Sequence, residues 1–376
     1  MIEKISVGGF KRFLAQKFRI APLTVLAGLN GAGKTSLIHA LLLMQESAGI
    51  EVGGELPLHV SDKLQLGTAE SVRNWSAKGN ISFGVEFDDG NIADWDLEVP
   101  ADAEALFLIV KKRPTLKNGP FVKSVRGFTY LCAERLGPRS TLNDSPISAE
   151  RLEVGQKGEF CAQVLEKLGS KPSIYADRVH PEKSSMDSSL LKYEVESWLS
   201  EIATPIEIAT IPTTGSAISA LQFRTPGGIW VRAPNMGFGV SYALPIVLAG
   251  LIASRDGILI VENPEAHLHP AGQSRMGSFL AWLAGKGVQV ILETHSDHVL
   301  NGVRRAIAEF DYLSHEQALV NFFSSDAHAA PDVKELLFSS TGGIANWPPG
   351  FFDQYQLDVA SLGRVRRKGA HGIRDQ

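Results

Sequence analysis

A chain of 376 residues is long enough for one large α/β domain with insertions, or for two domains. Hydrophobic residues make up 44% of the chain and charged residues 21%, which excludes the disordered and fibrous classes. The formal net charge of −4 argues against a globally basic nucleic-acid-binding protein, although a local basic patch is compatible with it.

The cysteines and the apolar segments predict a soluble protein of the cytoplasm, with no membrane partner. Cys132 and Cys161 are far apart and match no metal-binding spacing, so we expect reduced, buried thiols. Residues 1–18 lack the long apolar core of a signal peptide. The most apolar segment, residues 243–253, covers about half a membrane span and contains Pro245, so we expect a core helix there.

The first elements lead to a predicted phosphate-binding loop. Residues 2–20 predict a pair of strands, and the apolar residues 23–27 suit a buried parallel strand. Residues 28–35 read GLNGAGKT, which fits the pattern G-x-x-x-x-G-K-[ST], and an apolar helix follows. Glycines in such a loop let backbone N–H groups and the helix N-terminus face nucleotide phosphates.

Lys34 and Thr35 carry the chemistry of this loop. Lys34 would reach the β- and γ-phosphates of a nucleotide, and the Thr35 hydroxyl would bind Mg²⁺. The alternative is a glycine-rich turn that binds nothing, but both residues and both flanking elements favour a nucleotide site. The nucleotide-binding residues predicted here are Asn30, Gly31, Ala32, Gly33, Lys34, Thr35 and Ser36.

An antiparallel layer is predicted next. Residues 81–87 and 93–99 alternate between apolar and polar around a turn, which indicates a half-buried hairpin. We expect residues 105–110 and 121–132 to continue this layer as strands. The following loop carries Arg135 and Arg139, which could bind a phosphate or ribose, or could be solvated or paired with carboxylates.

Helical spacing then returns. Apolar residues within 160–168 and 191–202 predict two amphipathic helices that form a lobe on the main sheet, with a polar loop over residues 179–189. Strand patterns follow at residues 206–212, 217–224 and 228–232.

Residues 235–241, NMGFGVS, predict a second anion-binding site before an apolar helix. Gly237 and Gly239 permit close backbone approach, and Ser241 is the expected N-cap. One nucleotide rarely needs two such sites from one chain, so the predicted ligand of Gly239 and Ser241 is the nucleotide of a second copy. A flexible turn before a core helix is the alternative.

Residues 257–262 predict a buried strand that ends in Glu262. A carboxylate at the C-terminal end of a core strand beside a phosphate loop is where Mg²⁺ is held, directly or through water. His267 and His269 follow, but no clean third ligand accompanies them, so we expect structural hydrogen bonds rather than a metal.

Another buried strand, residues 288–292, leads into Glu293, Thr294, His295 and Ser296. An imidazole at this position can hydrogen-bond a γ-phosphate or its attacking water, so His295 is a predicted catalytic residue. Ser296 is the expected cap of the next helix.

These four motifs in this order resemble the ABC-class ATPase heads of bacterial AAA-type ATPases, the group near the OLD, SMC and RecF heads. Residues 342–353 are similar to a short C-terminal domain of unknown function in some members. The resemblance implies an α/β fold, that of a P-loop NTPase of ABC-ATPase type, with a mixed central sheet, an antiparallel β flank and a helical lobe.

The expected domain organisation follows from the same resemblance. Residues 1–320 would form the ATPase head, with a strand and helical insertion at about 80–232, and residues 321–362 a small C-terminal appendage. We expect short strands at 319–323 and 333–338, and we expect Trp347, Phe351 and Phe352 to fold back on the head. Residues 363–376 form a basic tail that could be flexible or could touch nucleic acid or a partner.

The resemblance also implies a function. ATP and Mg²⁺ would be the cofactors, Lys34, Glu262 and His295 the catalytic residues, and Thr35 and Glu262 the metal ligands. The head would dimerise head to tail on MgATP, or form a higher oligomer, and signal to an effector protein, a nuclease or toxin from the same operon, in anti-phage defence. The alternatives are a DNA-binding recombination or repair ATPase of RecF-like type and a nucleotide-sensing scaffold with little turnover.

One position departs from the pattern of these heads. Many of them place Asp and then Glu at the end of the acidic strand, where this chain has Glu262 and Asn263. An amide cannot accept the proton of the attacking water. Either Glu262 serves both roles, or Glu265 or His295 helps, or hydrolysis is slow.

Overall fold

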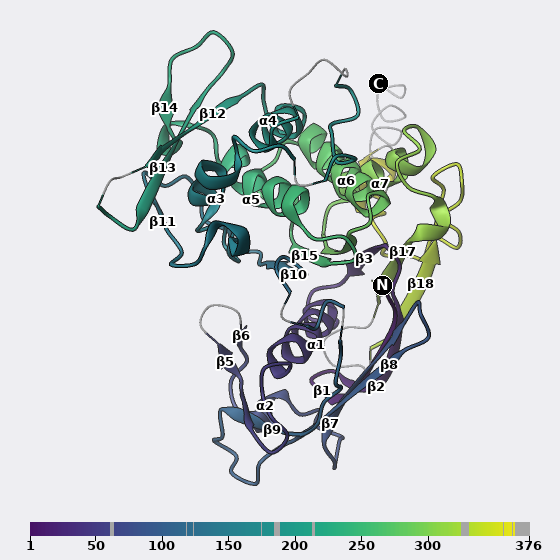
Figure 1. The fold of residues 1–376 in the computed structure, drawn as a ribbon. Helices are drawn as coiled ribbons and strands as arrows, with labels where there is room; N and C mark the ends of the chain where they lie inside the picture. Colours follow the sequence, from purple (N-terminus) through teal and green to yellow (C-terminus); the bar gives the residue numbers. More distant parts are fainter. Residues whose placement is uncertain are drawn as a thin grey trace, which may run out of the picture.

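The computed structural model describes residues 1–60, 64–117, 119–122, 124–173, 175–183, 189–212, 215–324, 331–355, 357–362 and 364. A central sheet separates a helical body from an antiparallel sheet that lies beyond helix α1 (Figure 1). Within the described residues, none of the helices combines the length and the apolar character needed to span a bilayer.

The central sheet has the strand order β10-β15-β16-β3-β17-β18. All neighbouring strands are parallel except the last pair, so the sheet is mixed, as predicted. Its strands are β10 (Phe128–Leu131), β15 (Ile258–Glu262), β16 (Gln289–Glu293), β3 (Leu23–Gly28), β17 (Ala318–Phe323) and β18 (Val333–Leu337).

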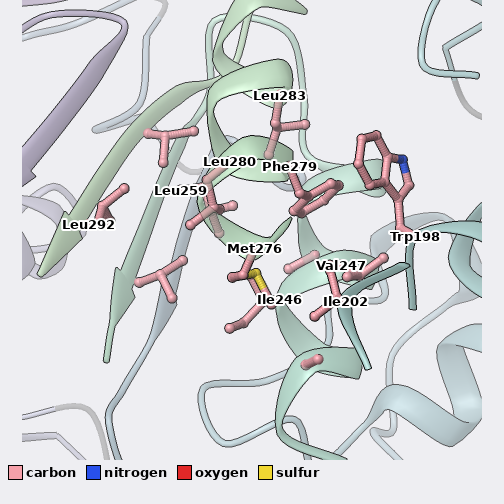
Figure 2. Close-up of a cluster of buried hydrophobic side chains, with 14 of the residues drawn as sticks. Trp198, Ile202, Ile246, Val247, Leu259, Met276, Phe279, Leu280, Leu283 and Leu292 are labelled. Carbon is pink, nitrogen blue, oxygen red and sulfur yellow. The ribbon is translucent and has the colours of Figure 1, made fainter. Parts of the chain in front are cut away.

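Both faces of this sheet are covered, which explains the continuous apolar runs of β15 and β16. Alternate residues of β15 enter different cores: Leu259 and Val261 pack with the helices, and Ile258 and Ile260 pack toward α1 and the antiparallel sheet. On the helical side, side chains of β15 and β16 meet those of three helices (Figure 2). These helices are α4 (Leu191–Ile202), α5 (Phe238–Ile252) and α6 (Pro270–Gly285), and α7 (Asp297–Ala308) joins the same core.

The antiparallel sheet lies across α1 (Lys34–Ser47), with its apolar residues facing the helix. Alternation is strict in the predicted hairpin, where Phe83, Val85, Ala93 and Trp95 are buried. The strand order is β2 (Phe13–Arg19), β1 (Ile2–Phe10), β7 (Ile81–Phe87), β8 (Ile92–Glu98), β9 (Phe107–Lys112) and β4 (Glu55–Pro57). Beside it lie β5 (His59–Val60), β6 (Leu64–Gln65) and α2 (Ala69–Val72).

The predicted lobe contains α3 (Cys161–Leu168) and α4, as the helical spacing indicated. Its outer sheet pairs β11 (Leu142–Asn143), β13 (Ile218–Arg224), β12 (Glu207–Pro212) and β14 (Val231–Arg232). Short 3-10 helices are η1 (Ala149–Arg151), η2 (Ala233–Asn235) and η3 (His315–Gln317). Both cysteines are free thiols: Cys161 is buried, as expected, but Cys132 is partly exposed.

The predicted antiparallel strand at 121–132 is wrong in extent and in partner. Among the described residues of this range, Phe128–Leu131 is the strand, and it pairs in parallel with β15 in the central sheet. The backbone turns just before it, at Arg126, whose φ of 56° is left-handed. Apolar alternation reveals a strand but not the strand with which it pairs, and here the partner is more than a hundred residues away.

The C-terminal residues extend the central sheet. Strand β17 pairs with β3, so the boundary expected after residue 320 falls inside a strand of the sheet. The prediction that the aromatic residues fold back is confirmed: Phe351 is buried, with its ring 5.2 Å from that of Phe322 and 4.7 Å from that of Trp347. The basic tail, apart from Arg364, lies outside the described residues.

Candidate active site

The candidate site lies where the parallel strands of the central sheet end. Strands β3, β15 and β16 finish at Gly28, Glu262 and Glu293, and the two glutamates are register partners on adjacent strands. His295 follows two residues after β16. In open parallel sheets, ligands bind at this carboxyl edge, so the fold brings the predicted residues of three distant segments together.

The phosphate loop depends on its glycines. Gly28, Gly31 and Gly33 have left-handed φ angles of 130°, 73° and 117°. A Cβ on Gly28 would overlap the carbonyl oxygen of Phe323, and one on Gly33 would lie 2.9 Å from the Phe13 ring. Gly33 is also the N-cap of α1, so the first N–H groups of that helix have no capping side chain and face the loop.

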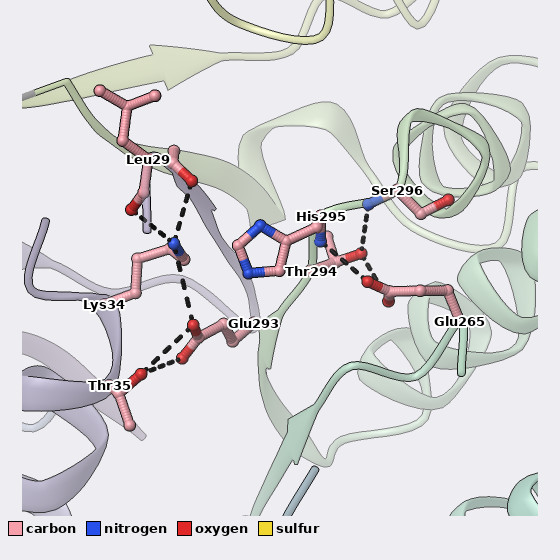
Figure 3. A network of polar contacts seen from close by, with 9 residues as sticks. Leu29, Lys34, Thr35, Glu265, Glu293, Thr294, His295 and Ser296 are labelled. Carbon is pink, nitrogen blue, oxygen red and sulfur yellow. Dashed lines mark hydrogen bonds and ion pairs between the residues drawn. The ribbon is translucent and has the colours of Figure 1, made fainter. Parts of the chain in front are cut away.

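Lys34 is held inside this loop. Its Nζ donates hydrogen bonds to the carbonyl oxygens of Gly28 and Leu29, both at 2.9 Å, and lies 3.9 Å from Glu293 Oε1 (Figure 3). The side chain is 3% exposed. Burial lowers the pKa of Lys34, and the Glu293 carboxylate opposes that shift. The ammonium therefore sits where the loop would receive phosphate oxygens.

Glu293 contacts Thr35, the residue that follows Lys34 in the phosphate loop. The Thr35 hydroxyl lies 3.1 Å and 3.3 Å from the two carboxylate oxygens of Glu293, to which it donates. Burial raises the pKa of Glu293 to about 7, with Lys34 acting against the shift and Glu262 adding to it. Glu293 was not among the site residues predicted from the sequence. It ends a core strand just as Glu262 does, so the reasoning that selected Glu262 could have found it.

Glu262 has its hydrogen-bond donors outside the phosphate loop. Its carboxylate accepts hydrogen bonds from the Tyr130 hydroxyl at 3.1 Å and from the Ala133 N–H at 3.2 Å. Burial raises the pKa of Glu262, and these two donors oppose the shift. Mg²⁺ prefers oxygen ligands and uses one or two carboxylates together with substrate phosphates. The hydroxyl of Thr35 with the carboxylates of Glu293 and Glu262 is a donor set that fits this ion.

His295 extends from the strand end toward the phosphate loop, with its ring near Lys34 and Glu293 (Figure 3). The backbone N–H of His295 donates to Glu265 Oε1 at 2.9 Å, and the Thr294 hydroxyl donates to Glu265 Oε2 at 2.7 Å. Partial burial and the Lys34 charge lower the pKa of His295, so the ring is neutral at pH 7. A neutral imidazole has one donor and one acceptor to offer a phosphate or a water.

Arg135 does not have either of the roles expected of it. The side chain is buried, and its guanidinium donates to the carbonyl oxygens of Cys132 at 3.0 Å and of Glu262 and Asn263 at 2.6 Å. It is neither solvated nor bound to a carboxylate, and its hydrogen bonds are used to fix the backbone after β15. Asn263 has a left-handed φ of 44°, a conformation that this clamp stabilises. Arg139 is exposed.

The predicted N-cap at Ser241 is wrong. Helix α5 begins earlier, with Gly237 as its N-cap, so Ser241 lies at the end of the first helical turn. Gly239 packs closely, since a Cβ there would lie 3.1 Å from the carbonyl oxygen of His267. Residues 237 and 238 are exposed, which places this turn on the surface beside the loop that follows β15.

Both histidines of that loop contact neighbouring residues of the chain. His269 Nδ1 accepts a hydrogen bond from the Ala271 N–H and caps α6, as expected. His267 packs its ring against Phe238 and Tyr242, at centroid distances of 5.1 Å and 4.3 Å. Among the described residues, no cluster of three or more His, Cys, Asp or Glu side chains is placed to hold a metal ion. Ser296 caps α7 through its hydroxyl, as predicted.

Two family models match parts of the chain. One, described as an AAA ATPase domain, matches residues 157–300. The other, described as a protein of unknown function (DUF3696), matches residues 313–362. A comparison with curated proteins finds no match.

Solved structures of SMC heads have the same fold. A structure of the SmcHead bound to the C-winged helix domain of ScpA is 12% identical, with a TM-score of 0.58 over 89% of this chain and 97% of that one. The Smc head with an extended coiled coil bound to the C-terminal domain of ScpA, derived from Pyrococcus furiosus, is 11% identical, with a TM-score of 0.53 over 97% and 99%. The predicted fold class, a P-loop ATPase head with a mixed sheet, an antiparallel flank and helices, is confirmed.

Proposed function

We propose that this chain binds MgATP at the carboxyl edge of its central sheet, hydrolyses it slowly, and closes on it as a head-to-tail dimer. The observation that carries the proposal is the joint placement of Lys34, Thr35 and Glu293 at the start of α1. A helix N-terminus, an ammonium and a hydroxyl converge there, and these are the groups that bind a triphosphate and its metal ion.

The residues would act as follows. Lys34 exchanges the carbonyl oxygens of Gly28 and Leu29 for phosphate oxygens, and Thr35 offers its hydroxyl as a metal ligand. Mg²⁺, when bound, would neutralise charge on the β- and γ-phosphate oxygens. His295, which is neutral at pH 7, donates a hydrogen bond to the γ-phosphate or orients the attacking water.

Glu262 is the proposed proton acceptor. Asn263 cannot take the proton, whereas Glu262 is a carboxylate at the end of the core strand next to β16. Burial raises the pKa of Glu262, which makes its carboxylate a stronger base toward water. Asn263 occupies the position at which many of these heads have the catalytic Glu, and for this reason we expect slow hydrolysis.

The exposed turn before α5 is the proposed contact between two copies. Gly237 and Phe238 are exposed, and the N–H groups of the first helical turn are available to an anion. We propose that Gly239 and Ser241 bind the nucleotide held by the other copy, so that each dimer encloses two nucleotides. Closure and reopening would signal to a partner protein, which we propose is an effector, a nuclease or toxin, in anti-phage defence.

Calorimetry and light scattering test these proposals. Wild-type protein should bind ATP in Mg²⁺ buffer, and Glu262→Gln should trap a dimer at saturating ATP because hydrolysis is blocked. Ser241→Arg should bind ATP and remain a monomer, whereas the matched surface change Ser170→Arg on the lobe should still dimerise. A Glu262→Gln protein that binds ATP but stays monomeric would refute the dimer, and an absence of ATP binding would refute the nucleotide site.

A further inference from the structure

Glu293 occupies the position closest to the phosphate loop among the acidic residues of the site. Strand β16 lies between β15 and β3, so Glu293 is one strand nearer to the loop than Glu262. Its side chain is 9% exposed and contacts the Thr35 hydroxyl and the Lys34 ammonium. Both partners belong to the loop, and both are groups that a bound MgATP would need.

The other two carboxylates have partners outside the loop. Glu262 accepts from Tyr130 and from the Ala133 N–H, and Glu265 accepts from Thr294 and from the His295 N–H. Of these three acids, all in the described part of the chain, Glu293 is the one with hydrogen bonds from the phosphate loop. A metal ion bound by the Thr35 hydroxyl would therefore have the Glu293 carboxylate as its nearest acidic ligand.

The charge at this edge is unbalanced in a way that a divalent cation would correct. Glu262 and Glu293 are register partners on adjacent strands, and the Lys34 ammonium lies 3.9 Å from the Glu293 carboxylate. A triphosphate would add several negative charges within a few ångströms, where repulsion in a poorly solvated site is strong. The carboxylate would oppose ATP alone and favour ATP accompanied by Mg²⁺.

We propose that Glu293 is a metal-binding residue of the ATP site and that it occupies Thr35 and Lys34 until MgATP enters. In the structure the carboxylate accepts a hydrogen bond from the Thr35 hydroxyl at 3.1 Å and lies 3.9 Å from the Lys34 ammonium. With MgATP bound, Glu293 and Thr35 would hold the ion, and Lys34 would be available to the phosphates. This inference rests on the proposed ATP site, and it leaves Glu262 as the proton acceptor.

The test is the Mg²⁺ dependence of ATP affinity, measured with a fluorescent ATP analogue in Mg²⁺ buffer and in EDTA. Wild-type affinity should rise at least about tenfold with Mg²⁺, which corresponds to about 1.4 kcal/mol. Glu293→Gln should lose most of this rise and should bind the analogue in EDTA severalfold more tightly than wild type does. Glu309→Gln, the matched change at an exposed carboxylate that pairs with Arg305 outside the site, should keep the full rise.

Two further measurements test whether the Glu293 carboxylate itself binds the metal ion. Glu293→Asp should keep part of the Mg²⁺ dependence because it retains the carboxylate, and electron paramagnetic resonance should detect fewer Mn²⁺ ions bound with nucleotide in Glu293→Gln than in wild type. An unchanged Mg²⁺ dependence in Glu293→Gln, with ATP still bound, would overturn this inference alone. If wild-type protein binds no ATP in either buffer, the proposed function fails and this inference fails with it.

Discussion

Two buried acidic residues of this molecule, Glu293 and Glu194, have opposite surroundings. Glu194, on α4 in the helical lobe, is fully buried and accepts hydrogen bonds from the His180 N–H at 2.7 Å and the Lys183 ammonium at 2.9 Å. Glu293 is also buried, but its cation, Lys34, lies 3.9 Å away and is bound to two carbonyl oxygens, while other carboxylates crowd it. Glu194 is bound by a backbone N–H and a cation at hydrogen-bond distance, whereas Glu293 is bound by one hydroxyl and has its cation at 3.9 Å.

The difference indicates what each acid is for. A buried charge that is matched by fixed donors holds a fold together, because nothing further can bind to it without breaking those contacts. A buried charge that has few hydrogen-bond donors and lies at the carboxyl edge of a parallel sheet indicates a ligand site. The predictions that follow test this contrast, from the largest expected free-energy change to the smallest.

Removal of the Glu194 carboxylate should cause the largest loss of stability. Glu194→Ala removes the buried acceptor of the hydrogen bonds from Lys183 and from the His180 N–H, so the free energy of unfolding should fall by about 3–5 kcal/mol. Urea unfolding measures this, and Glu309→Ala, which removes half of an exposed pair with Arg305, should change stability by less than about 0.5 kcal/mol. A loss under about 1 kcal/mol for Glu194→Ala would mean that the lobe acid is not structural.

Lys34→Ala should weaken ATP binding and leave the fold unchanged. Loss of the ammonium should weaken ATP affinity by at least about a hundredfold, or about 2.7 kcal/mol. Calorimetric titration with MgATP measures this, and circular dichroism should show an unchanged fold. The control Lys167→Ala, an exposed residue paired with Glu166, should leave the affinity unchanged. If both variants bind ATP equally well, the loop is not the nucleotide site.

The pH dependence of stability should differ between wild type and Glu293→Gln. A carboxyl group whose pKa is raised on folding stabilises the protein below its ordinary pKa, and that stabilisation is lost as pH rises through about 7. In EDTA without nucleotide, Glu293→Gln should therefore be more stable than wild type at pH 8, by about 2 kcal/mol, and nearly equal to it at pH 5. Urea unfolding at both values checks this, and an equal difference at both would contradict it.

Arg135→Lys should give the smallest effect, on turnover. A lysine cannot reproduce the planar guanidinium that binds the Glu262 and Asn263 carbonyl oxygens together, so Glu262 should lose its exact placement. We expect kcat to fall by about tenfold, or about 1.4 kcal/mol, with the ATP dissociation constant within about twofold of wild type. Arg139→Lys, on the same loop but exposed, is the matched control. An equal loss of kcat in both variants would mean that the hydrogen bonds from Arg135 do not position Glu262.

Much of the fold could be predicted because its signals are local. The loop from Gly28 to Thr35 needs only fixed spacing between a strand and a helix, and the hairpin strands at 81–87 and 92–98 need only alternation. Glu262 and His295 could be selected because each follows a run of buried strand residues. Where the signal was weak, as in residues 46–78, the short elements β4, β5, β6 and α2 were not anticipated.

The chain itself determined which segments become strands, helices and the phosphate loop, since backbone preference and apolar period act over a few neighbouring residues. The tertiary structure alone decided which of those segments meet. It placed β10 and β17 in the central sheet, turned Arg135 inward to the backbone of Glu262, and brought Glu293 to Thr35 across 258 residues of chain. Such contacts depend on the pairing of distant strands, which no local pattern encodes because a strand of suitable residues can pair with several others.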